Sequence, residues 1–286
     1  MSLYEKMFVV IDPTQEKQPA LKRAAEIAKK TKSSLTVFSA IYKSIEDMGA
    51  AKSRKSGKTA ELKAWDAKVK KMIEPVRAKG LTVKSDRYWT ADWYAAVSRA
   101  ALRSGANLVV KSTFRHGKLQ RLLHSTSDFT IMRHSPVPVL LVREDRKKGK
   151  SVVAAIDLES QDEGHMGLNN AVLKHAKEYA LAVKLPLHIV AAVSKKKADF
   201  SHILGDVDLT ASEQHEALAK EFGIKPSMFH LEKGDAKRVI VAQAKELGAD
   251  TLTIGVSACS GAKGVLVGTT VQKIIDKLDC DVLAVN

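Results

Sequence analysis

The chain has 286 residues, about twice the length of a typical domain, so its length predicts two domains. Its residues are 45% apolar and 28% charged, which is typical of a globular protein. No apolar run approaches the roughly 18–20 residues of a membrane-spanning helix, so we expect no membrane partner.

The N-terminus and the cysteines predict the cellular compartment of the protein. Glu5 stands just ahead of the apolar run Phe8–Ile11, unlike a secretory signal. Cys259 and Cys280 are the only cysteines, too few for a disulfide framework and without CxxC spacing. We therefore expect a reducing, cytoplasmic setting.

The net charge of +15 is carried entirely by the first half of the chain. Residues 1–143 hold 28 Lys and Arg against 12 Asp and Glu, whereas residues 144–286 hold 19 against 20. Two interpretations stay open for the first half: an anionic partner, or a solvated basic surface.

An internal repeat is the strongest signal in the sequence. Met7–Asp12 matches Val152–Asp157, and Ser104–Ser112 matches Leu247–Gly255, at offsets of 145 and 143 residues. A third match pairs the apolar ends of the two copies. We predict domains at 1–145 and 150–286, joined by the charged linker 144–150.

In chain order, short apolar runs alternate with segments whose apolar residues recur at helical spacing. The first copy predicts strand 8–11, helix 19–28, strand 35–40, helix 62–76, strand 81–89, helix 94–102, strand 108–110, helix 126–133 and strand 137–142. The second predicts strand 152–156, helix 168–183, strand 187–193, helix 211–222, strand 228–231, helix 237–247, strand 251–254, helix 269–278 and strand 282–285. Each copy is therefore an α/β, doubly wound domain with a five-stranded parallel sheet.

Two segments, 43–58 and 194–210, fit no regular element. Each follows the second strand of its copy, on the carboxyl side of the sheet, where ligands of such folds bind. Each is interpreted either as a lid over a site or as a surface excursion.

A glycine-rich loop, 255–270, follows the fourth strand of the second copy. Its backbone N–H groups can face an anion, and Gly268-Thr269-Thr270 opens a helix whose positive end favours a phosphate. Lys263 can contact a phosphate, and Asp157 can accept from a ribose hydroxyl or an adenine amine. The alternative is a flexible loop with an ordinary threonine cap.

The whole chain resembles tandem members of the universal stress protein family. The resemblance rests on first strands that end in Asp12 and Asp157, on Gly248-Ala249-Asp250, and on the PVLLV-type final strands. It implies the strand order 3-2-1-4-5 and two domains arranged as a pseudo-dimer, either monomeric or as a homodimer. It also implies a cytoplasmic role in growth arrest, oxidative stress and DNA damage resistance.

ATP-binding members of the family carry a loop of the form Gly-x2-Gly-x9-Gly-Ser/Thr, and the second copy departs from it only at Ala258. The resemblance implies ATP, ADP, AMP or another anionic small molecule there, and because the sequence shows no metal-ligand spacing we predict no metal. The predicted ligand-binding residues are Asp157, Ala192, Val193, Gly255, Ala258, Gly261, Lys263, Gly268, Thr269 and Thr270.

The first copy has a degenerate form of this site. Its predicted residues are Asp12, Lys111, His124 and Ser125, with Phe114 in place of the second glycine. We interpret it as closed to ATP, and its basic loop either attracts another anion or serves no ligand.

The sequence shows no catalytic constellation and no metal-ligand spacing, so we expect that the protein is not an enzyme. Slow ATPase activity or autophosphorylation at Thr269 or Thr270 stays open. Three functions are weighed: a ligand-binding stress protein with further protein partners, a ligand-free scaffold, and nucleic-acid binding through the basic first half. The third is disfavoured because the sequence shows no basic-aromatic motif.

Overall fold

The computed structural model describes residues 4–12, 14–44, 47, 54–113, 121–160, 162–193, 200–205, 209–256, 271 and 273–286, with the backbone alone for 54 and 121–127. The chain divides into two compact units. The first comprises 1–114 and 134–144, and the second comprises 115–133 and 145–286. Each unit is described by itself.

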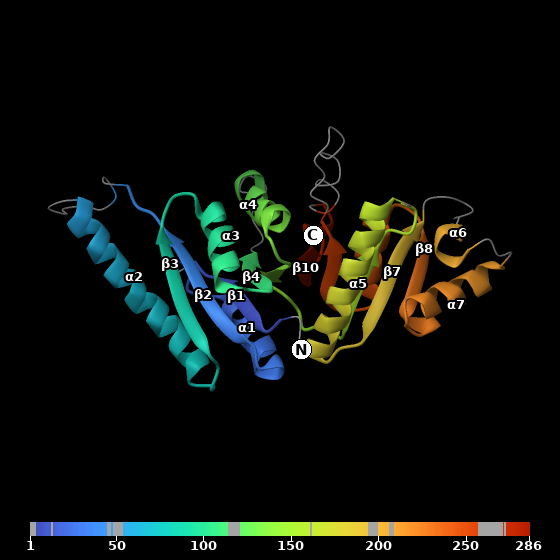
Figure 1. Cartoon of the computed structure of the whole chain (residues 1–286), viewed down its shortest axis with the longest axis horizontal. Coiled ribbons are helices and arrows are strands. Elements are labelled where there is room, and N and C mark those ends of the chain that lie inside the picture. Colours follow the sequence, from blue (N-terminus) through green and yellow to red (C-terminus); the bar gives the residue numbers. More distant parts are fainter. Residues whose placement is uncertain are drawn as a thin grey trace. The chain divides into compact units, whose positions relative to one another are not determined.

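The first unit contains a parallel sheet of five described strands in the order β3-β2-β1-β4-β5 (Figure 1). Its elements are β1 (Lys6–Val10), α1 (Pro19–Thr31), β2 (Ser34–Ile41), α2 (Arg54–Arg77), β3 (Val83–Trp89), α3 (Trp93–Ser104), β4 (Leu108–Thr113) and β5 (Val139–Arg143). Helix α4 (Arg121–His134) follows β4 in the chain but is grouped, up to Arg133, with the second unit.

The second unit repeats this topology, with its described strands in the order β8-β7-β6-β9-β10. Its elements are β6 (Ser151–Ile156), α5 (Glu163–Val183), β7 (Leu187–Val193), α6 (Ser201–Leu204), α7 (Ala211–Glu221), η2 (Pro226–Met228), β8 (Phe229–Lys233), α8 (Ala236–Glu246), β9 (Ala249–Gly255) and β10 (Asp281–Val285). The predicted doubly wound fold, with the strand order 3-2-1-4-5 in each copy, is confirmed.

The central strands are continuous apolar runs because both faces of each sheet are covered by helices. All six residues of β6 are buried, and in β1 only Lys6 is exposed. Helix α1 begins at Pro19, as the sequence predicts, and buries one face that includes Leu21, Ala24 and Ile27. The hydrophobic effect of this burial holds each sheet between two helical layers.

Three helices begin five or more residues earlier than predicted: α2 at Arg54, α4 at Arg121 and α5 at Glu163. Helix α5 begins at Glu163 rather than at residue 168, because Asp162 caps it by accepting a hydrogen bond from the His165 amide. Gly164, in the first turn, and Gly167 do not prevent the helix, since tertiary packing outweighs propensity. Residues 54–58 of the segment predicted to be irregular belong to α2, and Ser201–Leu204 forms a short helix in the other such segment.

The segment predicted as a linker is attached to the second sheet. Arg146 forms ion pairs with Asp250, through Nη2 and Oδ1, and with Asp281, through Nε and Oδ2 at 3.3 Å. Gly149 lies so close to β9 that a Cβ there would stand 2.1 Å from the Asp250 nitrogen. The chain therefore enters the second unit along a fixed path.

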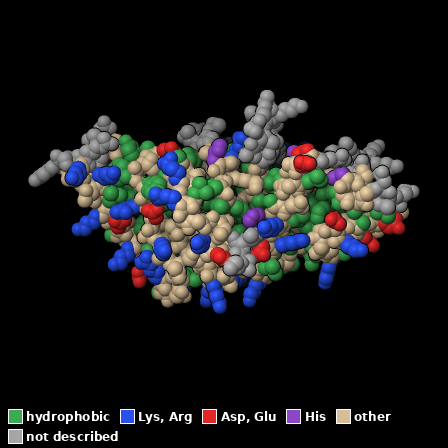
Figure 2. All heavy atoms as spheres, viewed as in Figure 1, with side chains coloured by type: hydrophobic (Ala, Val, Ile, Leu, Met, Phe, Trp, Pro, Cys, Tyr) green, Lys and Arg blue, Asp and Glu red, His purple; other side chains and the backbone are tan. Residues whose placement is uncertain are grey.

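Lys and Arg side chains are numerous over the first unit on the face that Figure 2 shows. Among the described helices, none is both long and apolar enough to cross a membrane.

Candidate functional site

The candidate site lies at the carboxyl edge of the second sheet, where β6 stands between β7 and β9. Ile156 pairs with Ala191 of β7, and Ala155 pairs with Ile254 of β9. The next residue, Asp157, therefore emerges between the ends of two strands whose crossovers run in opposite directions. Such a switch point is the usual ligand crevice of doubly wound sheets.

The carboxylate of Asp157 is exposed and held in one orientation. Its Oδ1 accepts from the backbone amides of Glu159 at 2.9 Å and Ser160 at 3.3 Å, and its Oδ2 accepts from the Ser160 hydroxyl at 2.7 Å. The Asn169 side chain pairs with both backbone groups of Asp157, at 3.0 Å and 2.6 Å. A positioned carboxylate of this kind can accept hydrogen bonds from a ligand at low entropic cost.

The first unit builds the same arrangement around Asp12. Its Oδ1 accepts from the amide and the hydroxyl of Thr14, at 2.9 Å and 2.6 Å. The side chain of Gln18 pairs with both backbone groups of Asp12, at 3.4 Å and 2.6 Å. The aspartate is therefore shared by both copies together with an amide partner, which sequence reasoning missed because Gln18 and Asn169 differ in type and spacing.

Gly255, the last residue of β9, is required by packing. A Cβ at this position would lie 2.7 Å from both Cγ and Cδ2 of Leu168 in α5, closer than carbon atoms can approach. The glycine therefore allows the start of α5 to lie directly on the end of the strand. The sequence also predicts a role for Gly255 in a phosphate loop, and the packing against Leu168 is compatible with that role.

Lys111, predicted from sequence as part of the degenerate site of the first copy, is not the counterpart of Gly255. Val142 of β5 pairs with Ser112, and Val285 of β10, which occupies the same place in the repeat, pairs with Gly255. The counterpart of the glycine is therefore Ser112. The repeat itself carried this signal, since it aligns the end of Ser104–Ser112 with the end of Leu247–Gly255.

Ser112 has a side chain where its counterpart Gly255 has none, and in the second unit Leu168 of α5 packs in that place. Its hydroxyl is buried and accepts a hydrogen bond of 3.1 Å from the Ala20 amide, which starts α1. The other predicted residues of the first-copy site are less defined: Phe114 lies outside the described residues, and of His124 and Ser125 only the helical backbone is described.

Ala192 and Val193 end β7, beside Asp157, as a ligand-lining role requires. The carbonyl of Val193 already accepts from the Gly234 amide at 2.9 Å, so this part of its backbone is used by the fold. Six further predicted ligand residues lie outside the described part of the chain: Ala258, Gly261, Lys263, Gly268, Thr269 and Thr270. Residues 271 and 273–275 are helical, in agreement with the helix predicted there.

Local contacts and burial shift the pKa values of titratable groups in the second unit. Hydrogen bonds from the backbone and the ring of His165 hold the pKa of the Asp162 carboxyl below its usual value. Burial, followed by the charge of Asp281, raises the pKa of the Cys280 thiol to about 12, so this thiol stays protonated and is a poor nucleophile. Within the described ranges, no group of three or more His, Cys, Asp or Glu side chains could hold a metal ion.

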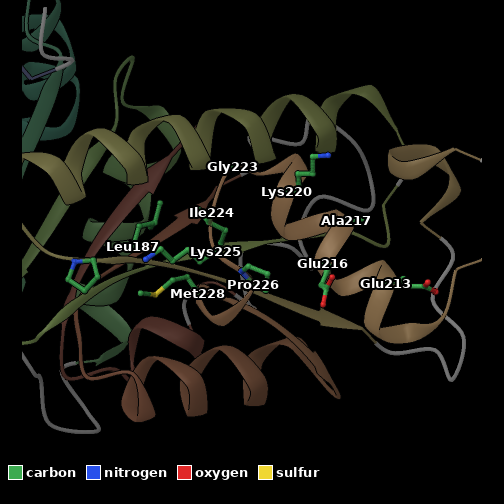
Figure 3. A pocket seen from close by; sticks show the side chains of 11 residues that line it. Leu187, Glu213, Glu216, Ala217, Lys220, Gly223, Ile224, Lys225, Pro226 and Met228 are labelled. Carbon is green, nitrogen blue, oxygen red and sulfur yellow. The ribbon is translucent and has the colours of Figure 1, made fainter.

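A groove of about 910 Å³ lies at the opposite, amino edge of the second sheet (Figure 3). Leu187, Ile224 and Met228 supply apolar surface, and Glu216 and Lys220 of α7 supply charge. Of the residues predicted for the ligand site, none of those that the structure describes lines this groove.

The comparisons with known proteins cover both copies. The model of the universal stress protein family matches residues 3–143 and 150–286. Universal stress protein E of Escherichia coli strain K12 is 27% identical, over 100% of this chain and 95% of that protein. Its counterpart in Photorhabdus laumondii is 28% identical, over 100% of this chain and 96% of that protein. A crystal structure of a functionally unknown protein from Pseudomonas aeruginosa PAO1 has a TM-score of 0.74 at 26% identity, covering 99% of this chain and 92% of that chain.

Proposed function

The chain belongs to the universal stress protein family, as a tandem member, and on that premise we propose that its second unit binds a nucleotide or a related anionic small molecule. ATP, ADP and AMP are the first candidates. The protein acts in this proposal as a cytoplasmic, non-enzymatic stress-response protein that supports survival in growth arrest, oxidative stress or DNA damage.

The observation that carries the proposal is the positioned, exposed carboxylate of Asp157 at the switch point of the second sheet. A carboxylate repels phosphate, so it suits the other end of a nucleotide and accepts from a ribose hydroxyl or an adenine amine. The phosphates are assigned to the glycine-rich loop that follows Gly255, whose sequence departs from the family pattern at one position. A ligand bound in this way spans the end of β6 and the loop after β9.

The contrast between the copies favours the second unit. Ser112 lies where the second unit has Gly255, and its hydroxyl accepts a hydrogen bond from the Ala20 amide at the start of α1. Asp12 keeps the geometry of Asp157, but the sequence that follows β4 has lost every glycine of the loop pattern. Division of labour between a binding unit and a unit for other partners follows from this difference.

The test is calorimetric titration of the full chain with ATP, ADP and AMP up to millimolar concentration, together with native mass spectrometry of the purified protein. Because Asp157 is charged, loss of one ligand hydrogen bond in Asp157→Ala is expected to weaken binding roughly tenfold or more. Gly268→Val should abolish it, because a branched side chain blocks a backbone approach to phosphate.

Asp12→Ala is the matched control, since it removes the equivalent carboxylate from the first unit, and it should leave affinity unchanged. Equal losses in the two aspartate variants, or retained affinity in Gly268→Val, would contradict the assignment. If no nucleotide binds at all, the ligand-free scaffold replaces the proposal. Incubation with ATP tests the non-enzymatic part, for which we expect neither ADP release nor phosphorylation of Thr269 or Thr270.

A further inference from the structure

Aromatic side chains gather at the carboxyl edge of the first sheet, although they are scattered in the sequence. Tyr42 follows the end of β2, and Trp89 is the last residue of β3. Their ring centroids lie 6.3 Å apart. Lys58, near the start of α2, places its ammonium 5.5 Å from the centroid of the Trp89 ring.

A second aromatic pair lies at the same edge. Trp93 and Tyr94 begin α3 and stack on each other at 4.0 Å, with an angle of 28° between their rings. Lys111, near the end of β4, holds its ammonium 5.7 Å from the Trp93 centroid. Each pair therefore combines two rings with one lysine, and we call the six residues the aromatic edge.

The aromatic edge is accessible. Tyr42 is 51% exposed, Lys58 is exposed, and the two tryptophans are half-buried. Accessible tyrosine and tryptophan rings offer large flat surfaces on which a partner can pack. The rings of the first pair lie at the ends of β2 and β3. Those of the second pair begin α3 only four residues after Trp89, so Trp89 and Trp93 lie at most roughly 14 Å apart along the chain.

The positive charge of the first half of the chain indicates an anionic partner. Residues 1–143 carry an excess of 16 positive charges, whereas residues 144–286 have one more acidic than basic residue. A basic surface with aromatic platforms is the recurring means of binding single-stranded nucleic acid, because bases stack on the rings while lysines meet the phosphates. We propose that the aromatic edge of the first unit binds single-stranded nucleic acid.

The presence of two separate ring pairs favours a single-stranded nucleic acid over a mononucleotide or a duplex. A mononucleotide offers one base, which uses one pair and leaves the other unoccupied. A duplex keeps its bases stacked inside, so it can meet the lysines but not the rings. A single strand presents successive unstacked bases and reaches both pairs, and this binding is independent of the nucleotide proposed for the second unit.

The test uses the full chain and a fluorescent oligothymidylate about 20 nucleotides long, followed by anisotropy at about 50 to 200 mM salt. Tyr42→Ala removes one stacking ring and should weaken binding roughly 5- to 100-fold. Lys58→Gln should lower the slope of log affinity against log salt by about 0.7, the value for one phosphate contact on a single strand.

Lys79→Gln is the matched control, since it removes the same charge beyond the other end of α2, and it should change affinity little. Asp157→Ala should have no effect, which separates this inference from the nucleotide site. Binding should also quench tryptophan fluorescence, and the quenching should disappear in a Trp89→Phe, Trp93→Phe variant that retains Trp65. Absence of binding at about 50 mM salt, equal affinity for a duplex, or equal losses in the two lysine variants would overturn the proposal.

Discussion

Replacement of Arg146 by Met should destabilise the second unit and leave the first unchanged. The guanidinium pairs with two carboxylates whose side chains are 3% exposed in Asp250 and 0% exposed in Asp281, and it is itself 18% exposed. Removal of the cation leaves two buried negative charges together. Loss of one partner from a buried ion pair typically costs about 3–5 kcal/mol.

The lower end of that range applies here, because Asp250 has further donors. The Gly149 amide lies 3.4 Å from its Oδ1, and the Thr251 hydroxyl lies 3.2 Å from its Oδ2. A loss of about 3 kcal/mol corresponds to a fall of roughly 10 °C in the melting temperature of a unit of this size.

The assay follows the two units separately in one chain. All three tryptophans, Trp65, Trp89 and Trp93, lie in the first unit, so tryptophan fluorescence reports that unit alone, whereas far-ultraviolet circular dichroism reports both. Lys147→Met is the control, because it removes a neighbouring charge that is exposed. The reasoning is refuted if Arg146→Met leaves the dichroism transition unmoved, if the control lowers it equally, or if the fluorescence transition moves as far.

Two further predictions concern the second unit. Gly255→Ala should destabilise it by about 1–3 kcal/mol, because the new Cβ meets Leu168 at 2.7 Å, and Leu168→Ala in the same chain should recover part of the loss; chemical denaturation checks both. His188 and His230 lie with Nδ1 and Nε2 2.9 Å apart, and burial lowers the pKa of each below its ordinary value of 6.5. The unfolded chain therefore takes up protons first, so stability is complete above about pH 6.5 and declines as the pH falls below it; in His188→Gln this decline should be shallower. A decline as steep as that of the parent would show that the pair is not responsible.

The topology could be predicted because the chain repeats itself. Once Met7–Asp12 and Val152–Asp157 are recognised as equivalent first strands, alternating strands and helices indicate a parallel, doubly wound sheet in each copy, and the resemblance to the family supplies the strand order. Element ends were less predictable. The start of α5 depends on the cap at Asp162 and on packing over Gly255, neither of which appears in apolar periodicity.

The candidate site was predicted in part. Asp157 and Asp12 stand out in the sequence because each ends a first strand, but their amide partners, Asn169 and Gln18, do not. The exchange of Gly255 for Ser112 could be read from the repeat, which pairs the two residues, but matching the two loops by residue type pointed to Lys111 instead. Register is determined by hydrogen bonds to β5 and β10, which are contacts between distant segments.

The sequence by itself determined the duplication, the doubly wound fold of each copy and the uneven charge, because these follow from local patterns and from their recurrence; the strand order came from the resemblance to the universal stress protein family. Only the tertiary structure decided that the charged segment after β5 is fixed by Arg146, that Gly255 makes room for Leu168, and that Tyr42, Trp89 and Trp93 share an edge with two lysines. The physical reason is common to all three: each depends on residues that lie far apart or without pattern in the sequence and meet only where parallel strands and their helices are brought together.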